Sequence, residues 1–135
     1  MDLPKKLIGE LYSERGSVVH SEMNSVIKTD HGKYLLVIKK TEYVIVCCSI
    51  NTNRVCFKPE ESQPKILKRE NDFLDHDSYV DCAQIFSIDV PKFYENINRG
   101  VFVPIGILNN LAMAAVLRAG QTCRTLKKFE QEYFK

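Results

Sequence analysis

The sequence has 135 residues, of which 44% are hydrophobic and 27% are charged, with 19 Lys and Arg against 17 Asp and Glu. A chain of this length buries roughly two thirds of its unfolded surface in one core, so neither a disulfide nor a metal is needed for folding. The net charge of +2 excludes a strongly basic nucleic-acid tail, and the hydrophobic content excludes a disordered chain. We expect a single domain over residues 1–135.

The apolar segments are short. The best stretches, 43–48 and 111–117, fall far below the ~20 residues that a bilayer requires, so no membrane span is expected. Residues 1–6 lack the apolar region and cleavage site of a signal peptide, which predicts a cytoplasmic protein. The five cysteines are odd in number and form no C-x-x-C pair, which argues against a zinc ribbon or a disulfide framework.

The first third of the chain has weak periodicity. Residues 7–12 alternate weakly and predict a first strand. Residues 13–32 are polar and predict a long loop, with a short strand at 25–28.

The clearest local pattern follows this loop. Residues 33–39 and 43–50 are rich in Val, Ile and Tyr and are separated by three polar residues, which predicts an antiparallel hairpin with both strands largely buried. Residues 54–57 predict an extension of the sheet. Pro59 and Pro64 then mark an exposed connection.

The following segment returns to strand. Residues 78–88 are partly apolar on both sides, which predicts a core strand. Pro91 indicates a short helical turn, and 103–106 a brief strand or bend in which Pro104 lies at a sheet edge.

Helical patterns close the sequence. Two helices are expected at about 109–119 and 123–134, the first capped by Asn109 or Asn110 and ended by Gly120, the second opened by Thr122 or Thr125. Short strands first and helices last predict an α+β fold, mainly β, with a small curled antiparallel sheet or barrel over about 7–106.

An acidic segment precedes the predicted core strand. Asp72, Asp75, His76, Asp77 and Asp81 fall within ten positions, and such side chains can bind a divalent cation or transfer protons. The spacing fits no metal motif. A solvated Asp-rich turn is our prediction, with a cation site as the alternative.

The polar loop offers acid–base groups. His20 and His31 lie there with two carboxylates, Glu22 and Asp30, and a histidine can act as acid or base near neutral pH. The alternative is that these are ordinary surface residues.

The predicted hairpin brings a cation near hydroxyls. Lys33 begins the first strand, Ser49 and Thr52 lie at the end of the second, and antiparallel pairing places these ends together. A lysine beside hydroxyls and amides suits a phosphate, although a solvated lysine gives the same pattern. The chain has no P-loop, nucleophile elbow or G-x-G-x-x-G motif.

The last third is basic. Residues 96–135 hold six Lys or Arg against two Glu. The aromatic residues Phe129, Tyr133 and Phe134 lie among these cations, which indicates either a nucleic-acid footprint or an amphipathic helix with a solvated face.

The order of these segments resembles the PemK/MazF-like toxins. The resemblance rests on GKYLLVI at 32–38, on 44–46 followed by polar residues, on DSYVDCAQI at 77–85, and on Ile105-Gly106 before a helix. It covers about residues 8–118. It implies a small SH3-like antiparallel barrel with C-terminal helices, a homodimer that cleaves single-stranded RNA without a metal or other cofactor, and a cognate antitoxin protein as partner.

The resemblance also assigns roles. Lys33 stands where the family has Arg, and Ser49 or Thr52 where it has Thr or Ser. A loop histidine, His20 or His31, or a loop carboxylate would take the proton of an attacking 2′-hydroxyl. Lys33 would stabilise the charge on the phosphate, and the Ser49 or Thr52 hydroxyl would hold a nonbridging oxygen. RNA-binding side chains are expected at Lys28, Lys39, Asn51, Asn53 and Arg54.

Two alternatives stay open. Lysine lacks the planar fork of arginine, so the chain is either a nuclease or a catalytically silent barrel that binds an antitoxin, a gyrase-like target or nucleic acid. The apolar residues at 101–105, with Leu108, Leu111 and Ala112, predict a dimer interface. The alternative is that the C-terminal helix covers them and keeps the chain monomeric.

Overall fold

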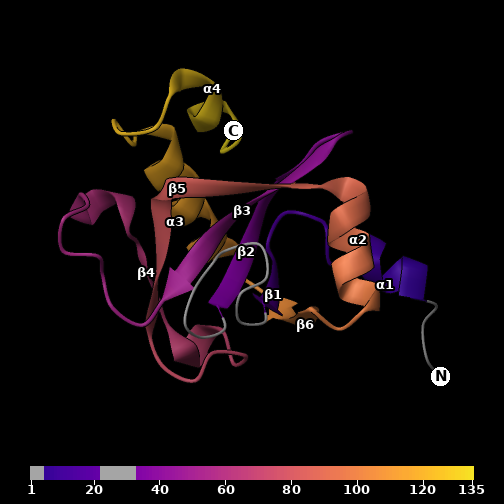
Figure 1. Cartoon of the computed structure of the whole chain (residues 1–135). Helices are drawn as coiled ribbons and strands as arrows, with labels where there is room; N and C mark the ends of the chain where they lie inside the picture. The colour runs from indigo at the N-terminus through magenta and orange to yellow at the C-terminus, as the bar shows by residue number, and fades with distance from the viewer. Residues whose placement is uncertain (1–4, 22–32) are drawn as a thin grey trace.

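The computed structural model describes residues 5–21 and 33–135 (Figure 1). The chain is α+β and mainly β, as the sequence predicts. The elements, in chain order, are α1 Lys5–Leu11, β1 Ser17–Ser21, β2 Lys33–Lys40, β3 Val44–Asn51, the 3-10 helix η1 Glu60–Ser62, β4 Lys65–Ile66, the 3-10 helix η2 Lys68–Glu70, β5 Ser78–Asp89, α2 Val90–Asn98, β6 Phe102–Ile107, α3 Asn110–Gln121 and α4 Lys128–Glu132.

The six strands form one antiparallel sheet in the order β4-β5-β3-β2-β1-β6. The sheet curls into a half-barrel whose edges are β4 and β6 (Figure 1). Within the described part of the chain these two edges do not pair with each other. The small curled sheet with C-terminal helices is therefore confirmed, with its two edges open.

Both faces of the sheet are covered. On β2, Leu36 and Ile38 belong to a core with α3 and the segment around α4, whereas Leu35 and Val37 belong to a core with α2. Figure 1 shows the two helix pairs on opposite sides of the sheet. A strand buried on both faces loses the alternation of a half-exposed strand, which explains why the hairpin reads as a continuous apolar run.

A register slip bends β5. Cys47 of β3 pairs with Phe86, whereas Ser49 pairs with Asp81, so β5 carries extra residues between these two points. Extra residues of this kind bend a strand, and Figure 1 shows the change in direction. Cys82 lies in the bend and donates its thiol to the carbonyl of Val116 in α3, at 3.7 Å. Despite the bend, β5 stays paired with β3 on both sides of the register slip.

Three predictions for the first half of the chain need correction. Residues 7–12 are mostly helical, because Ile8 and Tyr12 are one helical turn apart and both pack against the core beneath α2. The predicted loop at 13–32 contains the strand β1. Its sequence pattern is too short to indicate a strand, and pairing with β2 and β6 stabilises it. Residues 54–57 are not a strand. The short strand expected at 25–28 lies outside the described residues.

The C-terminal elements follow the sequence with changes at their ends. The turn at Pro91 is the helix α2, and β6 is an edge strand that carries Pro104. Asn109 caps α3, since its side-chain oxygen accepts the backbone N–H of Ala112 at 2.8 Å. Gly120 does not end α3, which continues to Gln121. Glycine is needed there because a Cβ would lie 2.1 Å from the ring of Phe134.

The second helix is shorter than predicted. It covers Lys128–Glu132 and begins after Lys127, whose backbone N–H donates to the Glu130 carboxylate at 2.8 Å. Arg15 fixes the residues that follow, because its guanidinium donates to the carbonyls of Ile38 and Lys135, each at 2.7 Å. The C-terminal segment is thereby tied to β2.

Candidate functional site

A pocket of about 450 Å³ opens at one end of the central strands. It is lined by Lys33, Tyr34, Ile50, Asn51, Thr52, Asn53, Val55, Asp75, His76 and Ser78. These residues come from the start of β2, the end of β3 with the loop after it, and the turn that leads into β5. The pocket thus combines three segments that are far apart in the sequence.

Strand register explains this convergence. Tyr34 pairs with Ile50, and Ile50 pairs with Val80, so the start of β2, the end of β3 and the start of β5 lie side by side. The row continues to β1, where His20 pairs with Tyr34. The apolar core fills this face farther along the strands, and polar side chains replace it where the strands end.

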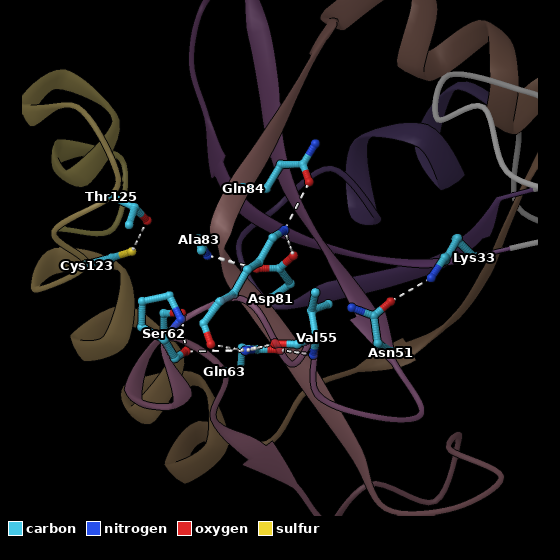
Figure 2. A network of polar contacts seen from close by, with 12 residues as sticks. Lys33, Asn51, Val55, Ser62, Gln63, Asp81, Ala83, Gln84, Cys123 and Thr125 are labelled. Carbon is cyan, nitrogen blue, oxygen red and sulfur yellow. Dashed lines mark hydrogen bonds and ion pairs between the residues drawn. The ribbon is translucent and has the colours of Figure 1, made fainter.

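Lys33 supplies a positive charge to the pocket. Its ammonium donates to the side-chain oxygen of Asn51 at 2.6 Å (Figure 2). Asn51 is neutral, and among residues 5–21 and 33–135 no carboxylate lies within ion-pair distance of Lys33. Asn51 thus orients the ammonium, and in the part of the chain that the structure describes no opposite charge offsets it, which suits an anionic ligand.

His76 presents one ring nitrogen to the pocket. Its Nδ1 lies 3.1 Å from the carbonyl oxygen of Asp77 and 3.3 Å from the hydroxyl of Ser78. A carbonyl can only accept, so Nδ1 carries the hydrogen and Nε2 is the acceptor nitrogen of the ring. Nε2 lies 3.5 Å from the hydroxyl of Thr52. The exposed imidazole thus offers a base next to a hydroxyl.

Tyr34 forms one wall of the pocket. Burial raises the pKa of Tyr34, and the nearby Asp75 carboxylate raises it further by its charge and by accepting a hydrogen bond from the phenol. The His20 ring packs edge-on against Tyr34, with 5.3 Å between ring centroids. Tyr34 therefore stays a neutral hydrogen-bond donor and links His20 to the pocket.

The carboxylates of the acidic segment have separate partners. Asp75 interacts with Tyr34. Asp77 accepts the backbone N–H of Lys68 at 2.9 Å, and Asp81 accepts the ammonium of Lys58 at 2.6 Å. Across the described residues, no three His, Cys, Asp or Glu side chains converge as cation ligands. The segment contributes His76 and Asp75 to the pocket, and Asp77 and Asp81 support the fold.

The pocket includes several of the site residues that were predicted from the sequence. Lys33, Asn51, Thr52 and Asn53 all line it, and His20 adjoins it through Tyr34.

Others lie elsewhere. Ser49 is buried and does not line the pocket, because it lies farther from the strand end than Asn51, where it pairs with Leu35 and Asp81 on the neighbouring strands. Lys39 lies near the other end of β2. Arg54 pairs with Glu60 and lines an adjoining pocket. Lys28 and His31, like Glu22 and Asp30, lie outside the described residues.

His76 was not selected as a catalytic residue from the sequence. The acidic residues around it favour a solvated turn, and three of them do have structural partners. The signal that points to His76 is its place directly before a core strand, where a turn brings its side chain to the sheet end.

The C-terminal basic segment offers little aromatic surface. Phe134 is fully buried and Leu126 is buried, because both pack on α3 and the sheet. Of the three aromatic residues of the proposed footprint, Phe129 is the exposed one, at 60%. The amphipathic interpretation therefore describes this segment better than the nucleic-acid footprint.

In comparisons with known proteins, the sequence matches no family model and no curated protein. None of the described helices has the length and apolar character needed to cross a membrane.

Proposed function

We propose that the protein is a metal-independent endoribonuclease that cleaves single-stranded RNA at the Lys33–His76 pocket. One observation carries the proposal: an ammonium oriented by a neutral amide, with no carboxylate partner among residues 5–21 and 33–135, lines the same pocket as an exposed imidazole whose Nε2 can accept a proton. A cation that stabilises a phosphate and a base that accepts a proton are the two groups that 2′-hydroxyl attack requires.

The reaction assigns a role to each group. His76 Nε2 accepts the proton of the 2′-hydroxyl while the 2′-oxygen attacks the adjacent phosphorus. Lys33 stabilises the negative charge that develops on the nonbridging oxygens, and the Thr52 hydroxyl donates to one of them. The bond from phosphorus to the 5′-oxygen breaks, and this oxygen takes a proton from solvent. The products are a 2′,3′-cyclic phosphate and a 5′-hydroxyl.

His76 is a better candidate for the base than His20. The His20 ring is engaged edge-on with Tyr34 and is not among the residues that line the pocket. His76 faces the pocket and lies near Thr52. A substitution at each histidine separates the two assignments.

The test is cleavage of a long single-stranded RNA by purified protein in excess EDTA, followed by analysis of the product ends. We expect cyclic-phosphate ends with the wild type, and a loss of rate of roughly a hundredfold or more for His76→Ala and for Lys33→Met. Lys39→Met and His20→Ala are the matched controls, and both should cleave. A 2′-deoxy substitution at the cut site should block cleavage there.

Two outcomes overturn the proposal. Intact RNA with the wild type would favour a barrel that binds without cleaving. Cleavage that survives both His76→Ala and Lys33→Met would place the reaction elsewhere.

We further propose a homodimer formed through β6 and the start of α3. Ile107 and Leu111 are 67% and 80% exposed, and Val103 is 42% exposed, so the C-terminal helix does not cover them. Phe102 is fully buried against Phe93 and therefore cannot report on an interface. An antitoxin protein, the partner that the resemblance implies, stays a prediction.

Light scattering tests the dimer. We expect twice the 15.5 kDa of one chain at micromolar concentration, and a fall to the monomer mass with Ile107→Asp. Phe57→Asp, at an exposed apolar residue in the loop after β3, is the control and should stay dimeric. A wild-type mass near that of one chain contradicts the dimer.

A further inference from the structure

A second pocket of about 430 Å³ adjoins the first. It is lined by Asn53, Arg54, Val55, Cys56, Lys58, Glu60, Gln63 and Tyr79. Asn53 and Val55 line both pockets. The loop after β3 is therefore a shared wall, and a chain that occupies the first pocket can extend into the second.

The second pocket has a flat aromatic wall. The guanidinium carbon of Arg54 lies 5.5 Å from the ring centroid of Tyr79, and the carboxylate of Glu60 pairs with Arg54. Because this carboxylate offsets the charge of Arg54, the pocket mainly presents a planar surface and has little free positive charge. Such surfaces of tyrosine and guanidinium stack on nucleic-acid bases.

The shape of this pocket is fixed by polar contacts within the protein (Figure 2). The buried side chain of Gln63 accepts the backbone N–H of Val55 at 2.6 Å and donates to the Val55 carbonyl at 3.1 Å. Lys58 donates to Asp81 at 2.6 Å and to Gln84 at 3.3 Å. A wall that is already ordered loses little conformational entropy when a ligand binds.

Asn53 supplies a polar group between the two pockets. Its side chain is exposed, and among the described residues it has no hydrogen-bond partner. The amide carries both donors and an acceptor, which matches the edge of an unstacked base.

We propose that this second pocket binds the base of the nucleotide next to the cleaved phosphate, with the base stacked at Tyr79 and Arg54 and its edge bonded to Asn53. The inference rests on the proposed function, because the first pocket holds the phosphate. It assigns the recognition of the RNA to residues that take no part in the chemistry.

Binding of 2′-deoxy-substituted RNA oligonucleotides, which cannot be cleaved, tests the inference by fluorescence anisotropy. Tyr79→Leu should weaken binding about fivefold to a hundredfold, while Tyr79→Phe, which retains the ring, should bind like the wild type. Tyr43→Leu is the control, since Tyr43 is 74% exposed in the turn between β2 and β3. Circular dichroism confirms that each variant folds.

Asn53→Ala provides the second measurement. With oligonucleotides of one base each, the wild type should prefer one base over the other three, and the variant should lose this preference while it keeps most of its affinity. Unchanged binding by Tyr79→Leu, or wild-type binding that shows no base preference, overturns the inference.

The outcomes for the two proposals are distinct. RNA cleavage that is normal in Tyr79→Leu, in both KM and kcat, would overturn the inference and leave the nuclease intact. Tyr79-dependent binding by a wild-type protein that cleaves no RNA would overturn the nuclease and retain a base-binding pocket.

Discussion

Two lysines of this protein make hydrogen bonds of the same length in two different surroundings. Lys33 donates to Asn51 at 2.6 Å in the open pocket (Figure 2). Lys58, in the loop that follows β3, donates to Asp81 at 2.6 Å. The first partner is a neutral amide and the second is a carboxylate whose side chain is only 4% exposed. The partner determines whether the charge of the lysine stays available to a ligand or is offset by a carboxylate of the fold.

The difference follows from what each oxygen needs. A carboxylate removed from water is costly unless a cation and further hydrogen bonds satisfy it, and Asp81 also accepts the backbone N–H of Ala83 at 3.0 Å. An amide oxygen makes no such demand. Asn51 thus holds the Lys33 ammonium in position and, being neutral, does not offset its charge, as the proposed phosphate contact requires.

The largest effect is expected at the buried pair. Lys58→Met leaves Asp81 buried without its cation and should lower the free energy of unfolding by about 3–5 kcal/mol. Urea denaturation followed by circular dichroism measures the loss. The double variant Lys58→Met with Asp81→Leu removes both charges and should recover most of it. A loss below about 1 kcal/mol in the single variant would contradict the assignment of Lys58 to the fold.

Lys33→Met should have the opposite profile. The side chain is partly exposed and its partner is neutral, so the free energy of unfolding should change by less than about 1 kcal/mol. Its binding of single-stranded RNA should lose one phosphate contact, which lowers the slope of log K against log salt by about 0.7. Lys39→Met, near the other end of the same strand, should leave the slope unchanged. An unchanged slope in Lys33→Met would show that Lys33 contacts no phosphate.

The buried and open regions also differed in how well the sequence predicted them. The hairpin of β2 and β3, the core strand β5 and the Asn109 cap were predictable because their signals are local: β-branched runs and a capping asparagine. The ion pair of Lys58 was not predictable, because its partner Asp81 is distant in the sequence and only the register of β5 brings the two together.

The candidate site was predictable in part for the same reason. Antiparallel pairing of one hairpin placed Lys33 beside Asn51 and Thr52. The place of His76 in the site could be predicted only from the pairing of β5 with β3. The role of Gly120, outside the site, could likewise be predicted only from the position of Phe134. Both depend on tertiary contacts that no local pattern encodes.

Thiol reactivity separates the same two regions. Burial raises the pKa of the Cys47 thiol to about 12, and burial together with the neighbouring Cys82 raises the pKa of Cys48. Of the five cysteines, Cys56 in the wall of the second pocket is the exposed one. Because the thiolate is the reactive form, a disulfide reagent at pH 8 should modify one thiol rapidly in the native protein and five after denaturation. Cys56→Ser should abolish the rapid phase, and a second rapid equivalent would contradict the buried arrangement.

A small, pH-dependent effect is expected at Tyr34, where the open pocket meets the core. Its pKa is raised by burial and by Asp75, so the folded state binds the phenolic proton more tightly than the unfolded state does. The associated stabilisation is complete below pH ~10, the ordinary pKa of tyrosine, and is lost as the pH rises through the higher folded value. Tyr34→Phe lacks this titration.

The variant should therefore be less stable than the wild type at pH 8, by about 1 kcal/mol for the lost hydrogen bond, and the difference should shrink between pH 10 and 12. Urea denaturation at pH 8, 10 and 11 measures it. All other alkaline titrations are common to the two proteins and cancel in the difference. Tyr12→Phe is the control, because Tyr12 packs on the other face of the sheet. A Tyr34→Phe difference that stays constant across this range would show that the phenol of Tyr34 is not held by Asp75.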